Sequence, residues 1–358
     1  MVVFVILLLV PIVLQHVVIG ERRITIEKKN QRAILAFFLI LAVLVALRHE
    51  RIGNDTSNYI YIFERISNMG WLETGKFSIE PGFALYNKIV SIFTKEPQVF
   101  LAVTAIATVA MIYPTYKRLG VDPSLTIMLF CTLSTFVMAF SGIRQMLAIG
   151  MGFLAYECTR RRKIVPYVIC ILLAVAFHTS AFMLAFMYPL YHARITKKWL
   201  LVVVPVVIAV FVFNEQLFGI LSVFLERYTD YGGGVERTGA YTMIILFSLF
   251  AVFSFLIPEE ASLDQETIGL RNFLLLSLVV QMFAPLHTLV MRMNYYYIIF
   301  IPLLLPKMIE KRSDRWNQVA IVARHVMVVF FLIYFFINAR GEDNLHVFPY
   351  HFFWEELG

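Results

Sequence analysis

The sequence has little charge and few cysteines. Of its 358 residues only 15% are charged and 60% are hydrophobic, and the mean hydropathy is +0.76. In soluble domains about a quarter of the residues are charged, so this composition excludes an ordinary soluble protein. We expect an all-α polytopic integral membrane protein that forms one domain over residues 1–358, with no separate soluble domain.

Several common site signatures are also missing. Cys131, Cys158 and Cys170 lie in or beside apolar runs without a CxxC pair, which is typical of small core residues and not of metal or disulfide sites. HExxH, P-loop and dinucleotide-binding patterns do not occur, so we expect no metal and no cofactor. Much of the net charge of +7 sits in short connections between apolar runs, as in membrane proteins, so no nucleic-acid partner is expected.

Apolar runs indicate about twelve transmembrane helices, several of them shorter than the ~20 residues of a straight crossing. They lie near 2–19, 33–47, 98–115, 124–140, 143–158, 164–178, 180–192, 199–213, 240–257, 272–290, 294–309 and 318–338. The first is interpreted as a retained span, because it lacks the basic start and cleavage pattern of a signal peptide.

Lys and Arg are more frequent in the connections on one side, which the positive-inside tendency makes cytoplasmic. The external segments are then about 48–97, 214–239 and 339–358. In the first of them, "PGFALYNKIVSIF" has the apolar spacing of an external loop helix. This helix either lies on the outer membrane surface or packs on the domain.

Several arginines break the charge bias because they fall on the external side. Arg144 lies about one turn inside an apolar helix, where an unpaired arginine is costly. Arg48, Arg51, Arg227 and Arg292 fall on the same side. Guanidinium groups gathered at one membrane face suit a bidentate clamp for phosphate or carboxylate oxygens. The alternative for Arg144 is a structural salt bridge between helices.

Acidic, histidine and tyrosine side chains are predicted on the same face. Asp55, beside Asn54, and Glu80 either act as a general base for a hydroxyl group or only neutralise the arginines. His178 ends an apolar helix, where it either contacts substrate and moves a proton or is structural. Most aromatic residues there are typical of an interfacial belt. The candidates for stacking on a sugar are Tyr228, Tyr231 and Tyr295.

A series of motifs then follows in a fixed order: "RHERIGNDTSNYIYIF", "EPGF", "FSGIRQMLAIGM", "FHTSAF", "NYYY" and "NLHVFPYHFFW". The series resembles the EpsG family of Wzy-type polysaccharide polymerases over most of the chain, and "SGIRQ" with "FHTSA" is its most specific part. The matching positions are Arg48, Gly53, Asn54, Asp55, Tyr59, Glu80, Pro81, Gly82, Ser141, Arg144, Gln145 and His178, and more loosely Arg227, Arg292, Asn294 and Tyr295.

The resemblance implies a C-type glycosyltransferase-like fold and a polymerase of O-antigen, capsule or exopolysaccharide repeat units in the bacterial cytoplasmic (inner) membrane. It implies transfer of a growing glycan from undecaprenyl pyrophosphate to the non-reducing end of a lipid-linked repeat unit, on the external, periplasmic face. No nucleotide sugar and no metal are implied. The expected partners are the undecaprenyl-pyrophosphate-linked donor and acceptor glycans and membrane lipids, and a chain-length regulator is a candidate.

The residue pattern and the resemblance together predict three catalytic residues. Arg144 would stabilise the departing diphosphate, and either Asp55 or His178 would take the acceptor proton in an inverting transfer. The predicted substrate and pyrophosphate contacts are Arg48, Arg51, Asn54, Glu80, Gln145, Arg227, Tyr228, Arg292, Asn294 and Tyr295. Two alternatives stay open, a glycan ligase that uses the same donor and a lipid-linked oligosaccharide flippase or other transporter. Charges at the rim and the lack of a half-to-half repeat favour an enzyme over a transporter.

Overall fold

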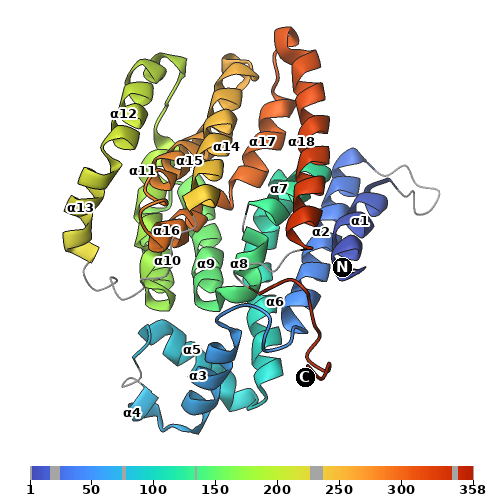
Figure 1. Cartoon of the computed structure of the whole chain (residues 1–358), viewed down its shortest axis with the longest axis vertical. Helices are drawn as coiled ribbons and strands as arrows, with labels where there is room; N and C mark the ends of the chain where they lie inside the picture. Colours follow the sequence, from blue (N-terminus) through green and yellow to red (C-terminus); the bar gives the residue numbers. More distant parts are fainter. Residues whose placement is uncertain are drawn as a thin grey trace. The chain divides into compact units, whose positions relative to one another are not determined.

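The computed structural model describes residues 2–16, 25–74, 78–133, 135–225, 237–340 and 346–357. Throughout these residues the regular secondary structure is helical, with two isolated β-bridges. The chain divides into two compact units, which we call unit 1 (Met1–Leu184 with Ala323–Gly358) and unit 2 (Ala185–Val322). Figure 1 shows the helices of both units. The single domain expected over 1–358 stays a prediction.

Unit 1 contains the N-terminal helices and most of the last long helix. Its helices are α1 (Val2–His16), α2 (Ile26–Ala46), α3 (Thr56–Asn68), α4 (Trp71–Thr74), α5 (Pro81–Phe93), α6 (Pro97–Leu119), α7 (Pro123–Thr132), α8 (Thr135–Ser141), α9 (Ile143–Arg160) and α10 (Ile164–Phe177). Two helices begin in one unit and end in the other, η1 (Thr179–Phe186) and α18 (Asn317–Asn338). The expected loop helix is confirmed as α5.

Unit 2 contains the remaining helices. They are α11 (Met187–His192), η2 (Lys197–Trp199), α12 (Leu200–Val212), α13 (Asn214–Leu225), α14 (Arg237–Leu256), η4 (Glu260–Ser262), α15 (Gln265–Gln281), α16 (Thr288–Ile298), α17 (Ile301–Glu310) and η5 (Asp314–Trp316). Within this unit α15 packs against α11, α14, α16 and α17, so α15 is its central helix.

Three helices of the described residues are long and apolar enough to cross a membrane, namely Ile26–Ala46, Pro97–Leu119 and Asp314–Asn338. Counting the bent helix pairs at 123–141 and 197–220 as one span each raises the number to five. Three further apolar helices, α1, α10 and the Ala240–Leu256 part of α14, are shorter. The chain is therefore a helical membrane protein.

The twelve spans expected from the sequence are not reproduced, because several apolar runs do not form one long helix. The run at 180–192 is the 3-10 helix η1 followed by the short α11. The run at 294–309 divides into α16 and α17, which end and begin around Phe300. An apolar run in this sequence therefore does not by itself mark one long helix.

Residues 346–357 lie against the end of α2 in unit 1. The backbone N–H of His49 donates to the carbonyl oxygen of His351 at 3.0 Å. The hydroxyl of Tyr350 donates to the carbonyl oxygen of Leu44 at 2.7 Å. These bonds hold the segment against the end of α2 and the first residues of the loop that follows it.

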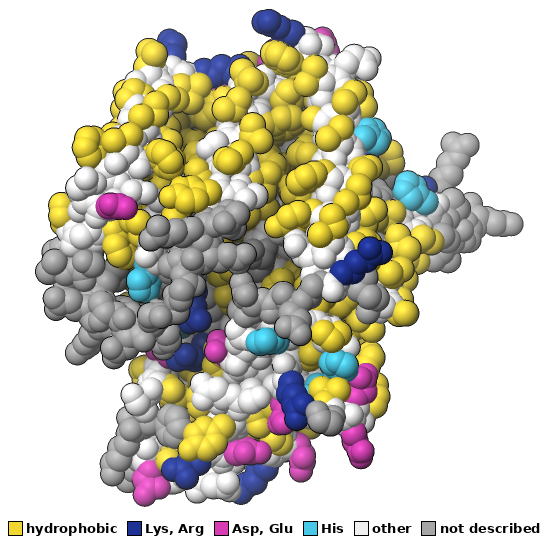
Figure 2. Space-filling view, in the orientation of Figure 1, with side chains coloured by type: hydrophobic (Ala, Val, Ile, Leu, Met, Phe, Trp, Pro, Cys, Tyr) yellow, Lys and Arg dark blue, Asp and Glu magenta, His cyan; other side chains and the backbone are white. Residues whose placement is uncertain are grey.

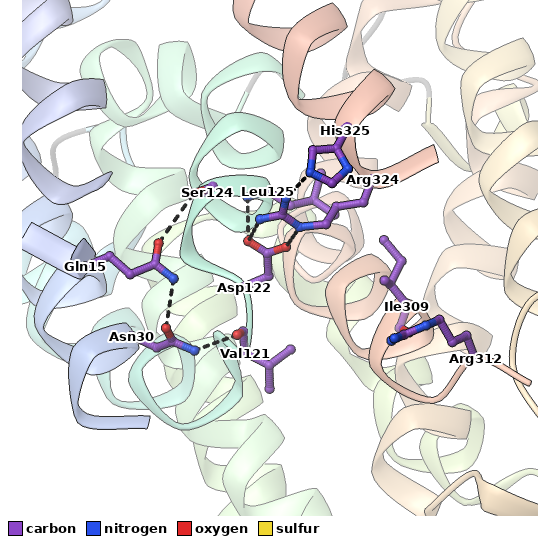
Figure 3. Close-up of polar contacts among 10 residues, drawn as sticks. All are labelled: Gln15, Asn30, Val121, Asp122, Ser124, Leu125, Ile309, Arg312, Arg324 and His325. Carbon is purple, nitrogen blue, oxygen red and sulfur yellow. Dashed lines mark hydrogen bonds and ion pairs between the residues drawn. The ribbon is translucent and has the colours of Figure 1, made fainter. Parts of the chain in front are cut away.

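A polar cluster holds α18 against the start of α7 in unit 1 (Figure 3). Arg324 donates from Nε and Nη2 to the two carboxylate oxygens of Asp122, the Nη2 bond measuring 3.0 Å. Asn30 of α2 donates to the carbonyl oxygen of Val121 at 2.6 Å and accepts from Gln15 of α1 at 3.0 Å. Because each partner is hydrogen-bonded, these partly buried polar groups do not oppose packing of α1, α2, α7 and α18.

The outer surface of unit 1 differs between its helices. Figure 2 shows hydrophobic side chains over the outward side of α18, whereas acidic and basic side chains gather around α3, α4 and the segment 346–357. In the most apolar stretch of the helix Asp314–Asn338, only 17% of the residues are buried inside the protein. An apolar surface of this extent is expected of a helix in contact with lipid.

Candidate active site

Three helix ends in unit 1 bring three of the predicted residues together. Glu80 is the N-cap of α5, and Pro81 follows it as the first helical residue, a position that suits the fixed φ of proline. Arg144 is the second residue of α9, and His178 is the C-cap of α10. The helices α5 and α9 both pack against α10, so these ends lie side by side.

Gly82 permits the close approach of α5 to α10. A Cβ atom at this position would lie 2.7 Å from the carbonyl oxygen of Ala176 and 2.9 Å from its Cβ. Backbone atoms cannot rotate away from such a contact, so only glycine fits without moving a helix. The approach places Glu80, two residues before Gly82, beside His178, two residues after Ala176. The "EPGF" motif therefore has a geometric reason.

The carboxylate of Glu80 lies between the other two side chains. Nη1 of Arg144 donates a hydrogen bond to Oε2 of Glu80. Nδ1 of His178 lies 3.3 Å from Oε1, an ion-pair distance, and the backbone N–H of Thr179 donates to the same oxygen at 3.4 Å. The side chains of Arg144, Glu80 and His178 are 21%, 16% and 15% exposed. We call these three residues the Glu80 cluster.

The environment of Glu80 keeps its carboxyl group ionised. Burial raises its pKa, but the imidazole of His178 and the positive charge of Arg144 lower it more, so the pKa falls to about 2. Glu80 is therefore a carboxylate at neutral pH. A group with so low a pKa is a poor general base, which favours a positioning or neutralising role for Glu80.

Arg144 has one contact that the sequence did not predict. Its guanidinium carbon lies 5.7 Å from the centroid of the Tyr59 ring, within the range of a cation–π interaction. Tyr59 is buried and packs edge-on against Phe83 at 5.7 Å between ring centroids. Among the described residues Nε of Arg144 has no hydrogen-bond partner. One face of the guanidinium is thus held, and one buried donor is available for a ligand.

His178 presents a second available atom. Both of its ring nitrogens are buried, and neither makes a hydrogen bond to another described residue. Nδ1 is the nitrogen near Glu80, so Nε2 is the ring nitrogen that does not face the carboxylate. A buried polar atom without a partner is uncommon in native structures and points to a ligand, a water molecule or a catalytic role.

A family comparison identifies the kind of protein that carries this cluster. The model of the EpsG family matches residues 32–352, which is most of the chain and includes the whole Glu80 cluster. The chain belongs to the EpsG family. EpsG is a family of Wzy-like polymerases, so the resemblance drawn from the motifs is confirmed. No curated protein and no solved structure matches the chain.

The EpsG-family segment "RHERIGNDTS" packs against the residues that precede Arg144. Gly53 has a φ of +82° and a Cβ there would lie 2.5 Å from the carbonyl oxygen of Phe140, so glycine is required twice over. The hydroxyl of Thr56 donates to the carbonyl oxygen of Ile52 at 2.6 Å and lies 3.3 Å from the same oxygen of Phe140. Asp55 is the half-buried N-cap of α3, and its carboxylate makes no hydrogen bond or ion pair within the described part of the chain. Its predicted role as a base stays a prediction.

Hydrogen bonds to α2 and α3 hold the side chain of Arg48 in place. Its side chain is fully buried, with Nε donating to the hydroxyl of Thr56 at 3.3 Å and Nη1 donating to the carbonyl oxygen of Val45. Burial lowers its pKa to about 10, so it remains charged at neutral pH. Nη2 has no hydrogen-bond partner among the described residues. Arg48 thus joins α2 to α3, and its predicted contact with diphosphate stays a prediction.

The other predicted contacts of unit 1 differ in exposure. Gln145 is buried next to Arg144, whereas Arg51 and Asn54 are exposed in the loop after α2. In the parts of the chain that the structure describes, no group of three or more His, Cys, Asp or Glu side chains is placed to hold a metal ion.

Of the predicted contacts that the structure describes, three belong to unit 2. Arg292 is half-buried and Tyr295 is buried. Asn294 is fully buried and donates to the carbonyl oxygen of Ser277 and to Oε1 of Gln281, both at 3.0 Å. These bonds give Asn294 a role in joining α15 to α16. Arg227, Tyr228 and Tyr231 lie outside the described residues.

Sequence reasoning missed the link between the residues of the Glu80 cluster. Glu80 was expected either to act as a base or to neutralise the arginines, but the sequence did not show that its partners would be Arg144 and His178. Its predicted contact with substrate or pyrophosphate stays a prediction. The available signal was the Pro-Gly pair after Glu80, which marks a helix start under tight packing. The Tyr59 contact had a weaker signal, its place one turn into the helix that follows Asp55.

Proposed function

We propose that this EpsG-family protein is a polysaccharide polymerase with a C-type glycosyltransferase-like fold in the bacterial cytoplasmic membrane. It transfers a growing glycan from undecaprenyl pyrophosphate to the non-reducing end of a lipid-linked repeat unit on the outer face. Family membership supports the reaction class. The observation that carries the proposed site is the Glu80 carboxylate held between Arg144 and His178, two residues that each keep a buried polar atom without a partner.

Arg144 would stabilise the leaving group. Its Nη1 is occupied by Glu80 and its guanidinium lies near the Tyr59 ring, so the side chain is fixed before substrate arrives. Nε can then donate to a diphosphate oxygen without reorganising the site. A charged donor that is positioned in advance stabilises the negative charge that develops as the glycosidic bond to phosphate breaks.

His178 would take the acceptor proton. The acceptor hydroxyl oxygen attacks the anomeric carbon of the donor, the bond from that carbon to the diphosphate oxygen breaks, and its electron pair remains on the diphosphate. The hydroxyl proton passes to Nε2 of His178. We assign the other ring proton to Nδ1, beside the Glu80 carboxylate, which then stabilises the imidazolium. Attack opposite to the leaving group inverts the anomeric centre. Asp55 is the alternative base.

The test is a complementation series in a deletion strain. The variants are Arg144→Ala, His178→Ala and Asp55→Ala, with Arg65→Ala as the matched control because Arg65 is an exposed arginine of α3 outside the cluster. Membrane levels are checked, and surface polysaccharide is separated on gels. We expect Arg144→Ala and His178→Ala to reduce the ladder to single repeat units, and Arg65→Ala to retain it. Loss with Asp55→Ala but not with His178→Ala would make Asp55 the base.

The deletion strain itself distinguishes the other functions. Long glycan chains that remain on the carrier lipid would indicate a ligase instead of a polymerase. A lack of glycan at the outer face would indicate a flippase or other transporter. A normal ladder from Arg144→Ala at matched protein level would refute the proposed site.

A further inference from the structure

Helix α5, which starts at the Glu80 cluster, is apolar on two opposite sides. Phe83 and Val90 are buried against neighbouring helices, in the core cluster that includes residues of α3, α6 and α9. On the outward side Leu85, Ile89 and Ile92 are 50%, 43% and 62% exposed. Phe93, the last residue of the helix, is 83% exposed.

The outward residues form one continuous stripe. Leu85, Ile89, Ile92 and Phe93 follow the i, i+4, i+7, i+8 spacing that places side chains on one helix face. We call these four residues the α5 stripe. Pro81 is the remaining exposed residue of the helix, so the exposed surface of α5 carries no charged side chain. Water does not favour an exposed surface of this kind.

The neighbouring helix α3 provides an internal comparison, since α3 and α5 pack against each other. The exposed positions of α3 are Ser57, Asn58, Tyr61, Glu64, Arg65 and Asn68. All of these carry a polar group, as expected of a helix face in water. Two packed helices of one external segment therefore face different surroundings.

The one lysine of α5, Lys88, is buried and points away from the outward side. Nζ of Lys88 donates to the carbonyl oxygen of Ile66 at 3.3 Å and to that of Met69, at the end of α3. It also lies 5.8 Å from the centroid of the Trp71 ring, and Trp71 is 56% exposed. The only cation of α5 thus neutralises a helix end and leaves the stripe uncharged, beside an exposed aromatic residue of the type found at membrane interfaces.

The position of α5 in the chain indicates what covers the stripe. Residues 47–96 connect α2 to α6, and both of these helices are long and apolar enough to cross a membrane. The start of α5 also packs on the end of α10 through Gly82. The outward residues of α10 are apolar up to Leu172 and Leu173, which are 65% and 51% exposed. An apolar surface of the membrane-embedded helices therefore leads up to α5.

We propose that the α5 stripe rests in the lipid bilayer, at the boundary between headgroups and acyl chains, while α3 faces water. The occupant of this surface is the phospholipid of the membrane itself. The proposal does not depend on the polymerase reaction. Because Glu80 is the N-cap of α5, the same helix would hold the Glu80 cluster near headgroup depth.

The test places a fluorescent label at one cysteine of the full-length protein after replacement of Cys131, Cys158 and Cys170. Labels are placed at Ile92→Cys and at Phe93→Cys, and the matched control is Glu64→Cys on the polar face of α3. The protein is reconstituted in phosphatidylethanolamine–phosphatidylglycerol vesicles. Quenching is measured with a doxyl-labelled phospholipid and with iodide on both sides of the membrane.

We expect doxyl lipid to quench the Ile92 and Phe93 labels roughly threefold more than the Glu64 label, and iodide to show the opposite order. Iodide quenching of the α5 labels as strong as that of the Glu64 label would overturn the proposal, since α5 would then face water. Protection of the α5 labels from both quenchers would also overturn it, because a second copy or another protein would then cover the stripe. The polymerisation assay does not enter this test.

Discussion

The substitution Glu80→Gln tests the electrostatics of the cluster most directly, because it removes the negative charge and keeps the shape of the side chain. One pKa unit corresponds to about 1.4 kcal/mol, so lowering the pKa of Glu80 from 4.5 to about 2 stabilises the folded protein by about 3 kcal/mol before screening. The carboxylate side chain is 16% exposed, and solvent screening reduces this contribution to about 2 kcal/mol.

The dependence of this contribution on pH follows from the direction of the shift. The folded-state pKa lies below the unfolded-state value, so the stabilisation is complete above about pH 4.5, decreases as the pH falls, and is lost as the pH passes through about 2. Glu80→Gln cannot titrate at this position. The difference in stability between wild type and variant should therefore be large at neutral pH and small in acid.

The assay is thermal unfolding of the purified full-length protein in detergent, at neutral pH and at about pH 3. We expect Glu80→Gln to lower Tm at neutral pH and the gap to narrow in acid. Glu64→Gln is the matched control, since Glu64 is exposed on α3, and it should leave Tm nearly unchanged. An equal gap at both pH values, or no gap at neutral pH, would refute the assignment of the carboxylate as a stabilising partner of Arg144 and His178.

Three further substitutions test other parts of the fold and site. Gly82→Ala should destabilise the protein by about 1–3 kcal/mol through overpacking, with a lower Tm and a weaker polysaccharide ladder. Gly219→Ala, where a Cβ meets nothing within 4 Å, should not lower Tm; equal effects would contradict the close approach of α5 to α10. Arg144→Lys keeps the charge but lacks the Nε donor, so the polymerisation rate of the purified protein should fall about 100-fold, while the level of the variant in the membrane stays normal. Full activity would contradict the proposed donor. Asn294→Ala leaves Oε1 of Gln281 without its bond, so Tm should fall by the equivalent of about 1–3 kcal/mol; an unchanged Tm with lost activity would instead favour a substrate contact.

The sequence predicted the members of the Glu80 cluster but not their arrangement. Arg144 was conspicuous because it breaks the charge bias near the end of an apolar helix, and His178 because it ends the next one. Both helix ends agree with the structure. The carboxylate that joins them belongs to Glu80, which is far from both residues in the sequence. A sequence separation of this length does not show whether two residues are in contact. Only the packing of α5 on α10 brings the three groups together.

Helix α5 shows what a periodic sequence pattern can and cannot predict. The bounds expected for α5 are confirmed, but its apolar residues do not all face one way. Phe83 and Val90 point into the core, whereas Leu85, Ile89 and Phe93 point outward. Hydrophobic spacing alone could not separate these two sets, because protein core and lipid select the same side chains. The exposed fractions separate them.

The bonds that join the segment 346–357 to the end of α2 and to the loop after it have a consequence for biogenesis. Leu44, near the end of α2, and Tyr350, which are hydrogen-bonded, are 306 residues apart. In the loop itself the N–H of Gly53 donates to the carbonyl oxygen of His346 at 3.1 Å. A ribosome releases the loop long before it makes the segment that holds it. We expect the loop that carries Asp55 to take its final form only after the later segment has been synthesised and has reached the same side of the membrane. Incomplete translation products would then insert into the bilayer without being able to extend a glycan. The protein would become active only at a late step of its insertion.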